Sequence, residues 1–213
     1  MSFSFLLFFI LVVFWRPQEW LFPFLYGWPI LDAVVYGSVL ALLLEFETPR
    51  VSFDSRRPQP ALYLGLFVAA ILSHVAHGYL QGILDNWFDA FRICFFGILL
   101  SVNLTSSVRL RWIVRTFVVM SLFMAVHAIL QQRNGGGFGG LQPIMSWRPN
   151  VQGMVPRAQF FGIFGDPNDM AQMFVTSMPL CFLFFRKCSF LTTCIGLAMC
   201  YVFYLGVEAC WSR

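Results

Sequence analysis

The most informative polar segment of the sequence runs from Arg157 to Asp169 and leads into an apolar stretch. It ends in the pattern of a helix start, because Asp166 suits the N-cap, Pro167 the first helical position and Asp169 the third. A helix N-terminus carries partial positive charge, so together with Arg157 it could hold a diphosphate. The alternative is a well-capped helix without a ligand, because Asp166 and Asp169 already supply negative charge there.

Further arginines accompany this segment. Arg133, Arg148 and Arg157 all fall in one long polar stretch between apolar runs. A guanidinium binds phosphate oxygens in bidentate geometry, so the three would suit a glycan diphosphate, with Asn168 and Asp166 shaping the adjoining helix start. The alternative is that they are the few solvated charges that a loop of this length carries.

The three histidines, His74, His77 and His127, are candidate acid–base groups, because all lie near the predicted outer ends of their helices. His74 and His77 are three residues apart and share one face of a predicted helix, close in sequence to Asp89 at the start of the next. Such groups could deprotonate an acceptor hydroxyl, and Asp32 is a further candidate near the same end. The alternative is that Asp89 and Arg92 form an ion pair within one helix, while the histidines bond interfacial water.

Metal and nucleotide chemistry lack support in the sequence. The six cysteines fall mostly inside apolar runs, without a Cys-x-x-Cys pair or Cys/His ligand spacing, and are interpreted as apolar core residues. The glycine-rich stretch from Asn134 to Gly140 lacks the pattern of a phosphate-binding loop, so we expect it to be flexible. We predict neither a metal nor another cofactor.

The composition places these residues in a membrane protein. Hydrophobic residues make up 59% of the 213 residues and charged residues only 11%, with a mean hydropathy of +0.73. Soluble domains carry roughly 25% charged residues, which excludes a water-soluble enzyme, a disordered tail and a disulfide-stapled secreted domain. The net charge of +4 is scattered over the loops, so no nucleic-acid partner is expected.

Seven apolar runs could cross a bilayer, which needs about 20 apolar residues for each span. They are residues 3–15, 29–46, 61–77, 87–103, 112–129, 170–185 and 191–205. The first is short, so we predict an all-α, polytopic integral membrane protein with about six or seven transmembrane helices in one domain over residues 1–213. Loop arginines predict a cytoplasmic N-terminus and an outer loop at about residues 131–167.

Two motifs resemble a known family. Residues 157–180 resemble the signature of the O-antigen ligase and polymerase superfamily: an arginine, a glycine- and phenylalanine-rich approach to Asp-Pro-Asn, and a helix ending in Pro-Leu. The sequence from Arg16 to Trp20 resembles the opening of many of these chains. The motifs cover about 30 residues, and the multi-span layout of the whole chain agrees with them.

The resemblance implies a glycan transferase of the bacterial inner membrane. Such a protein takes a glycan from undecaprenyl diphosphate on the periplasmic face and passes it to lipid A core, another glycan or a protein. The resemblance implies that outer arginines bind the diphosphate and that neither a nucleotide sugar nor a metal is needed. Fixed cations would stabilise the charge that develops on the leaving group.

The resemblance also implies what these residues lack. The sequence stops at Arg213, near where members of the superfamily continue into further helices and a second large outer loop with a histidine. We therefore expect an incomplete active site here. The alternative function is a non-catalytic remnant, or an accessory protein that binds or exports lipid-linked glycans.

Overall fold

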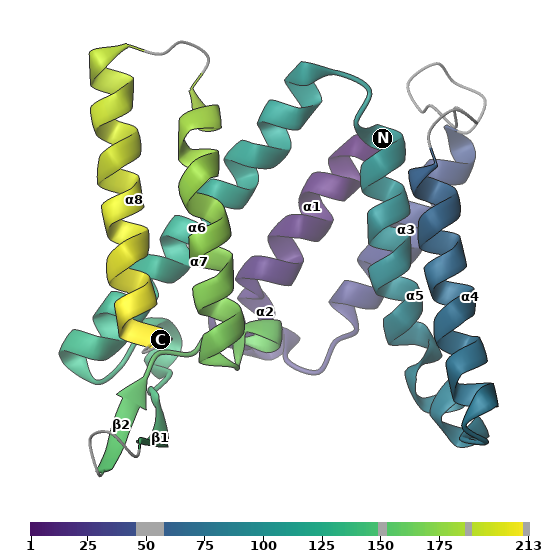
Figure 1. The fold of residues 1–213 in the computed structure, drawn as a ribbon, viewed down its shortest axis with the longest axis horizontal. Coiled ribbons are helices and arrows are strands. Elements are labelled where there is room, and N and C mark those ends of the chain that lie inside the picture. The colour runs from purple at the N-terminus through teal and green to yellow at the C-terminus, as the bar shows by residue number, and fades with distance from the viewer. Residues whose placement is uncertain (46–57, 149–152, 186–188, 211–213) are drawn as a thin grey trace. The chain divides into compact units, whose positions relative to one another are not determined.

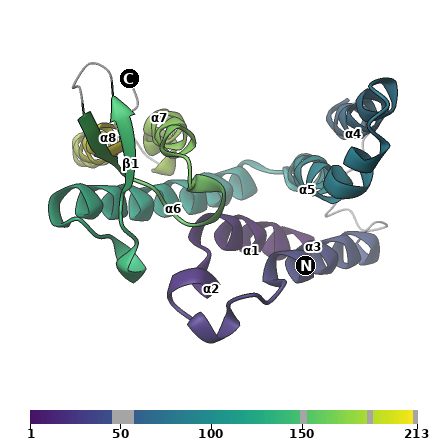
Figure 2. The ribbon, with the colours of Figure 1, turned by 90° about the horizontal axis from the view of Figure 1, so that it is seen from below.

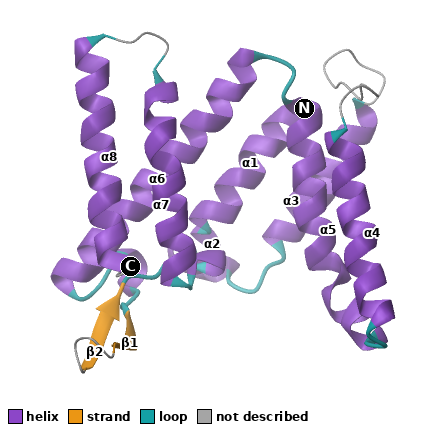
Figure 3. Ribbon diagram, in the orientation of Figure 1, coloured by secondary structure: helices purple, strands orange, loops and turns teal. Residues whose placement is uncertain are grey.

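The computed structural model describes residues 1–45, 58–148, 153–185 and 189–210, without the side chains of Pro23 and Arg148. Within these residues the regular structure is almost entirely helical, with one two-stranded hairpin (Figure 3), which confirms the mainly α-helical fold predicted from the sequence. The α-helices are α1 (Ser2–Trp15), α2 (Pro17–Trp20), α3 (Ile30–Leu44), α4 (Gln59–Ala76), α5 (Leu80–Asn103), α6 (Ser107–Asn134), α7 (Pro167–Phe184) and α8 (Phe190–Cys210) (Figure 1). The strands are β1 (Ile144–Arg148) and β2 (Gly153–Arg157), and the 3-10 turns are η1 (Pro23–Leu25), η2 (Phe138–Gly140) and η3 (Gly162–Phe164).

Four helices are long and apolar enough to cross a membrane, judged by length and composition over the described residues. They are Ser2–Trp20, Gln59–Ala76, Ser107–Asn134 and Phe190–Cys210. Helix α3 is apolar but shorter. Helices α5 and α7, which the sequence also predicts to span, are not among the four; α5 carries Asp85, Asp89 and Arg92. The count of six or seven spans stays a prediction.

The chain divides into two compact units. The first unit comprises Met1–Phe9 and Pro29–Leu110, and the second comprises Ile10–Trp28 and Arg111–Arg213. Each unit is described by itself below.

In the first unit α4 and α5 pack extensively against each other. The ring of Tyr63 lies directly over Gly97, where a larger residue would not fit. Polar groups gather where α1 begins and α3 and α5 end. Ser2, 1% exposed, donates from its hydroxyl to Asn103 Oδ1 at 2.9 Å and from its backbone N–H to Glu45 Oε2 at 3.0 Å. The Met1 ammonium and then Ser2 hold the pKa of Glu45 at about 2, below its ordinary value of 4.5.

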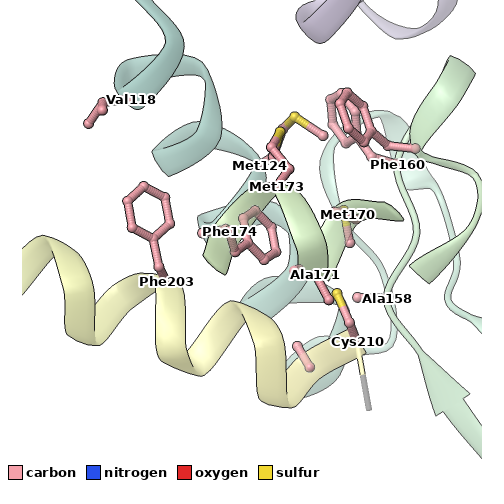
Figure 4. Packing of buried hydrophobic residues seen from close by; sticks show 14 of the residues in the cluster. Val118, Met124, Ala158, Phe160, Met170, Ala171, Met173, Phe174, Phe203 and Cys210 are labelled. Carbon is pink, nitrogen blue, oxygen red and sulfur yellow. The ribbon is translucent and has the colours of Figure 1, made fainter. Parts of the chain in front are cut away.

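In the second unit α7 and α8 are antiparallel neighbours on one side of α6, as Figure 2 shows. Their buried side chains form one apolar core (Figure 4), in which the ring of Phe174 lies over Gly206 and stacks on Phe203 at 6.1 Å. The hydroxyls of Ser177 on α7 and Ser121 on α6 are hydrogen-bonded, with their oxygens 2.9 Å apart. This packing places the end of α8 beside the beginning of α7.

The segment between α6 and α7, residues 135–166, is termed the α6–α7 connection. It holds η2, the hairpin and η3, so it contains regular structure that the sequence analysis described only as a loop. In the hairpin Trp147 pairs with Met154, and Arg148 with Gly153. The connection carries Arg148, Arg157 and Asp166, three of the five predicted diphosphate-binding residues, so its placement decides what they can contact.

Candidate functional site

Arg157 lies at the end of β2 and contacts two other elements. Its Nη2 donates to Asn168 Oδ1 at 2.7 Å, at the start of α7, and its Nε donates to the carbonyl oxygen of Cys210 at 2.9 Å, at the end of α8. The backbone N–H of Ala158 donates to the carbonyl of Ala209 at 3.0 Å. The last carbonyls of a helix carry partial negative charge and lack intrahelical partners, so Arg157 and Ala158 together cap α8.

The beginning of α7 has the geometry that the sequence predicts. Asp166 is the N-cap, and its carboxylate accepts from the backbone N–H of Asn168 at 2.8 Å. Pro167 occupies the first turn, and Asp169 adds a second carboxylate there. The predicted residues Arg157, Asp166 and Asn168 therefore lie together, with the Asn168 side chain linking the guanidinium to the helix start.

The two sequence motifs meet in the second unit. The Arg16 side chain packs directly over Gly162, in the space that a side chain at position 162 would occupy. Arg16 has a left-handed backbone (φ 43°) between α1 and α2 and pairs with Glu19 at 2.5 Å. Residues that are far apart in the sequence, Arg16 and Gly162, thus adjoin the same short stretch that carries Arg157.

The other two predicted arginines are placed less specifically. Arg133 is exposed in the last turn of α6. The backbone of Arg148 ends β1, but its side chain lies outside what the structure describes. The interpretation that these two side chains assist Arg157 stays a prediction.

Two polar residues of α6 are buried against the connection: His127, one of the candidate acid–base histidines, and Gln131, which was not among the predicted site residues. His127 and Gln131 are 0% and 1% exposed, and each binds backbone atoms of the α6–α7 connection. In the glycine-rich stretch that we expected to be flexible, Gly137 lies against the His127 ring and Gly139 against Trp20, whereas open space surrounds the other three glycines. The signal for Gln131 was its position four residues after His127, near the end of an apolar helix.

The other two candidate acid–base residues, His74 and His77, lie in the first unit. His77 is exposed just after α4, and its Nδ1 lies 2.7 Å from the carbonyl of Ser73. His74 is half-buried, with its ring 5.8 Å from that of Tyr79. The predicted pair Asp89 and Arg92 is present at 3.1 Å.

Arg92 also binds Asp32 across helices at 2.8 Å, which the sequence spacing could not indicate. Arg92 additionally lies over the ring of Phe88, at 4.4 Å from its centroid. The guanidinium of Arg92 therefore pairs with both carboxylate candidates of this unit, Asp32 and Asp89. No group of three or more His, Cys, Asp or Glu side chains suited to a metal occurs within the described ranges.

Comparison with known proteins yields no relatives. No protein family matches the chain, no curated protein is similar to it, and no solved structure matches it. The arrangement around Arg157 must therefore be interpreted from its own chemistry. A guanidinium beside a helix start, with an amide side chain next to it, can bind and orient an oxyanion.

Proposed function

We propose that the chain is a membrane protein of the lipid-carrier glycan transferase type, similar to the O-antigen ligases. In this proposal it resides in the bacterial inner membrane with the α6–α7 connection on the periplasmic face. Its donor is a glycan on undecaprenyl diphosphate, and its acceptor is lipid A core, another glycan or a protein. The four long apolar helices support membrane residence.

One observation carries this proposal: the two motifs that resemble the superfamily come together in the second unit. Arg16 of the first motif packs on Gly162 of the second, and Arg157 reaches Asn168 at the start of α7. The diphosphate would be held by Arg157 and by the beginning of α7, with Arg133 and Arg148 as further cations. Cations held in place before the reaction would stabilise the departing diphosphate without reorganisation.

A second candidate function is binding without transfer, as in an accessory protein for lipid-linked glycans. The observation that favours it is that His127, the histidine of the second unit, has both ring nitrogens engaged by backbone groups. A ring so held is not available to deprotonate an acceptor hydroxyl. Under this alternative the same arginines bind the diphosphate, and no glycan is transferred.

The test uses the purified full-length gene product in nanodiscs, with undecaprenyl diphosphate as the probe. We expect Arg157→Ala to weaken binding roughly ten- to a hundredfold, the effect of losing a charge-assisted contact. Arg111→Ala is the control, because Arg111 lies at the opposite end of α6. Undiminished binding by Arg157→Ala would contradict both candidates.

A transfer assay separates the two candidates. The wild-type protein is incubated with a glycan on undecaprenyl diphosphate and with lipid A core, and the product is measured by mass spectrometry. Transfer that Arg157→Ala abolishes, with membrane insertion intact, supports the transferase. Binding without transfer supports the accessory function.

A further inference from the structure

His127 and Gln131 each join the same two parts of the α6–α7 connection. His127 Nδ1 accepts from the backbone N–H of Phe138 at 3.0 Å, and its Nε2 lies 3.1 Å from the carbonyl of Gln159. Gln131 Nε2 donates to the carbonyl of Leu141 at 2.9 Å, and its Oε1 accepts from the backbone N–H of Gln159 at 2.9 Å. The two side chains therefore hold Gln159 by both its N–H and its carbonyl.

The bonding pattern settles the state of the imidazole. Because Phe138 donates to Nδ1, that nitrogen carries no proton, and the proton must be on Nε2, which donates to Gln159. The ring of His127 is therefore neutral and in one tautomer. Each of the four polar atoms of the His127 and Gln131 side chains has a backbone partner, although both side chains are buried.

The position of Gln159 connects this pair to the candidate site. Its neighbours Ala158 and Phe160 are each 2% exposed, and Ala158 is bonded to the end of α8. Arg157 lies two residues before Gln159 on the same extended stretch. The bonds that hold the Gln159 peptide therefore also restrict the positions that the Arg157 guanidinium can occupy.

We propose that His127 and Gln131 are positioning residues: they attach the α6–α7 connection to α6 and thereby set the place of Arg157. This inference depends on the proposed function in one respect only, the identity of the ligand that Arg157 binds. The attachment itself is a property of α6 and can be measured without any glycan. It gives a reason for two polar side chains at full burial in a long apolar helix, where such groups are costly.

Amide hydrogen exchange tests the attachment bond by bond in the full chain. His127→Phe removes the acceptor for Phe138, so we expect faster exchange at the Phe138 amide while the Gln159 amide stays protected. Gln131→Met should do the reverse. Gln132→Met is the matched control, because Gln132 is the exposed neighbour on the same helix and should leave both amides unchanged. Equal loss of protection throughout α6, α7 and α8 would mean that the pair only stabilises the fold and would overturn the proposal.

Arginine labelling tests the consequence for the site. We expect Gln131→Met to raise the rate at which phenylglyoxal modifies Arg157 severalfold, with Arg133 as the internal reference at its wild-type rate. A purely structural role would raise both rates together, and an unchanged Arg157 rate would also overturn the proposal. The outcome is independent of the proposed function. If Arg157→Ala binds undecaprenyl diphosphate normally while Gln131→Met still exposes Arg157, the positioning role stands and the function fails.

Discussion

The two units use their polar side chains differently. In the first, charged side chains pair with one another, as Arg92 does with Asp32 and Asp89. In the second, His127 and Gln131 bind the backbone of a segment that has few helical bonds of its own. Ion pairs between helices neutralise charge where the surroundings are apolar, whereas side chain–backbone bonds fix a loop in place. The comparison indicates that polar groups serve helix packing in the first unit and placement of the candidate site in the second.

The largest expected effect comes from breaking the ion pairs of the first unit. Arg92→Leu leaves Asp32 and Asp89 close together without their cation. Since these side chains are partly exposed, we expect a loss of about 2–3 kcal/mol, between the values for buried and surface pairs. The measurement is the free energy of unfolding in mixed micelles.

Asp89→Ala is the matched control for this variant, because the Asp89 side chain is 69% exposed. It should cost about 1 kcal/mol or less. If the two variants lowered the free energy of unfolding equally, Arg92 would not stabilise the first unit through its pairing with Asp32. The proposed difference between the two units would then be contradicted.

The second-largest effect tests the packing of the α6–α7 connection. Gly137→Ala places a methyl group against the His127 ring, and overpacking of this kind costs about 1–3 kcal/mol. Gly136→Ala is the control, since open space surrounds Gly136, and it should change stability by less than about 0.5 kcal/mol. Thermal unfolding in detergent measures both variants. A flexible glycine run, as the sequence alone suggested, predicts no difference between them.

Local features of the fold were readable from the sequence, because their causes are close in the chain. The start of α7 follows from Asp166 and Pro167, and the pair of Asp89 with Arg92 follows from helical spacing. The contacts between residues far apart in the sequence could not be predicted. Asp32 pairs with Arg92 on another helix, and Gln131 bonds to Gln159 in the connection.

The reason is that the bond between Gln131 and Gln159 depends on how the connection folds back, and the pair of Asp32 with Arg92 depends on how α3 packs beside α5. The hairpin pairs Trp147 with Met154, and both of these apolar residues are exposed, so the sequence does not mark which face of the strands is buried. Glycines at positions 137 and 139 look like flexibility in a sequence. Their true role, close approach to an aromatic or imidazole ring, appears only with the neighbour in place.

A smaller effect is expected from pH in the first unit. The Met1 ammonium and Ser2 lower the pKa of Glu45 to about 2 from 4.5, so the folded state favours the ionised carboxylate. This contribution is complete above about pH 4.5 and is lost as the pH falls toward 2. After solvent screening we expect at most about 1 kcal/mol. Glu45→Gln should flatten the stability profile over this window, and an unchanged slope would contradict the assignment to Glu45.

The smallest expected effect comes from a hydrogen bond between two helices of the second unit, and it tests the comparison between the units. Ser177 and Ser121 are both fully buried and bond side chain to side chain between α7 and α6, so they resemble the pairs of the first unit but carry no charge. Such bonds between apolar helices contribute about 0.6 kcal/mol on average, which is our expectation for Ser177→Ala. Thr176→Ala is the control, because Thr176 also donates to the Met173 carbonyl but is exposed on the same helix. If Ser177→Ala were as harmful as Arg92→Leu, bonding between helices would matter equally in both units, and the distinction between packing and placement would fail.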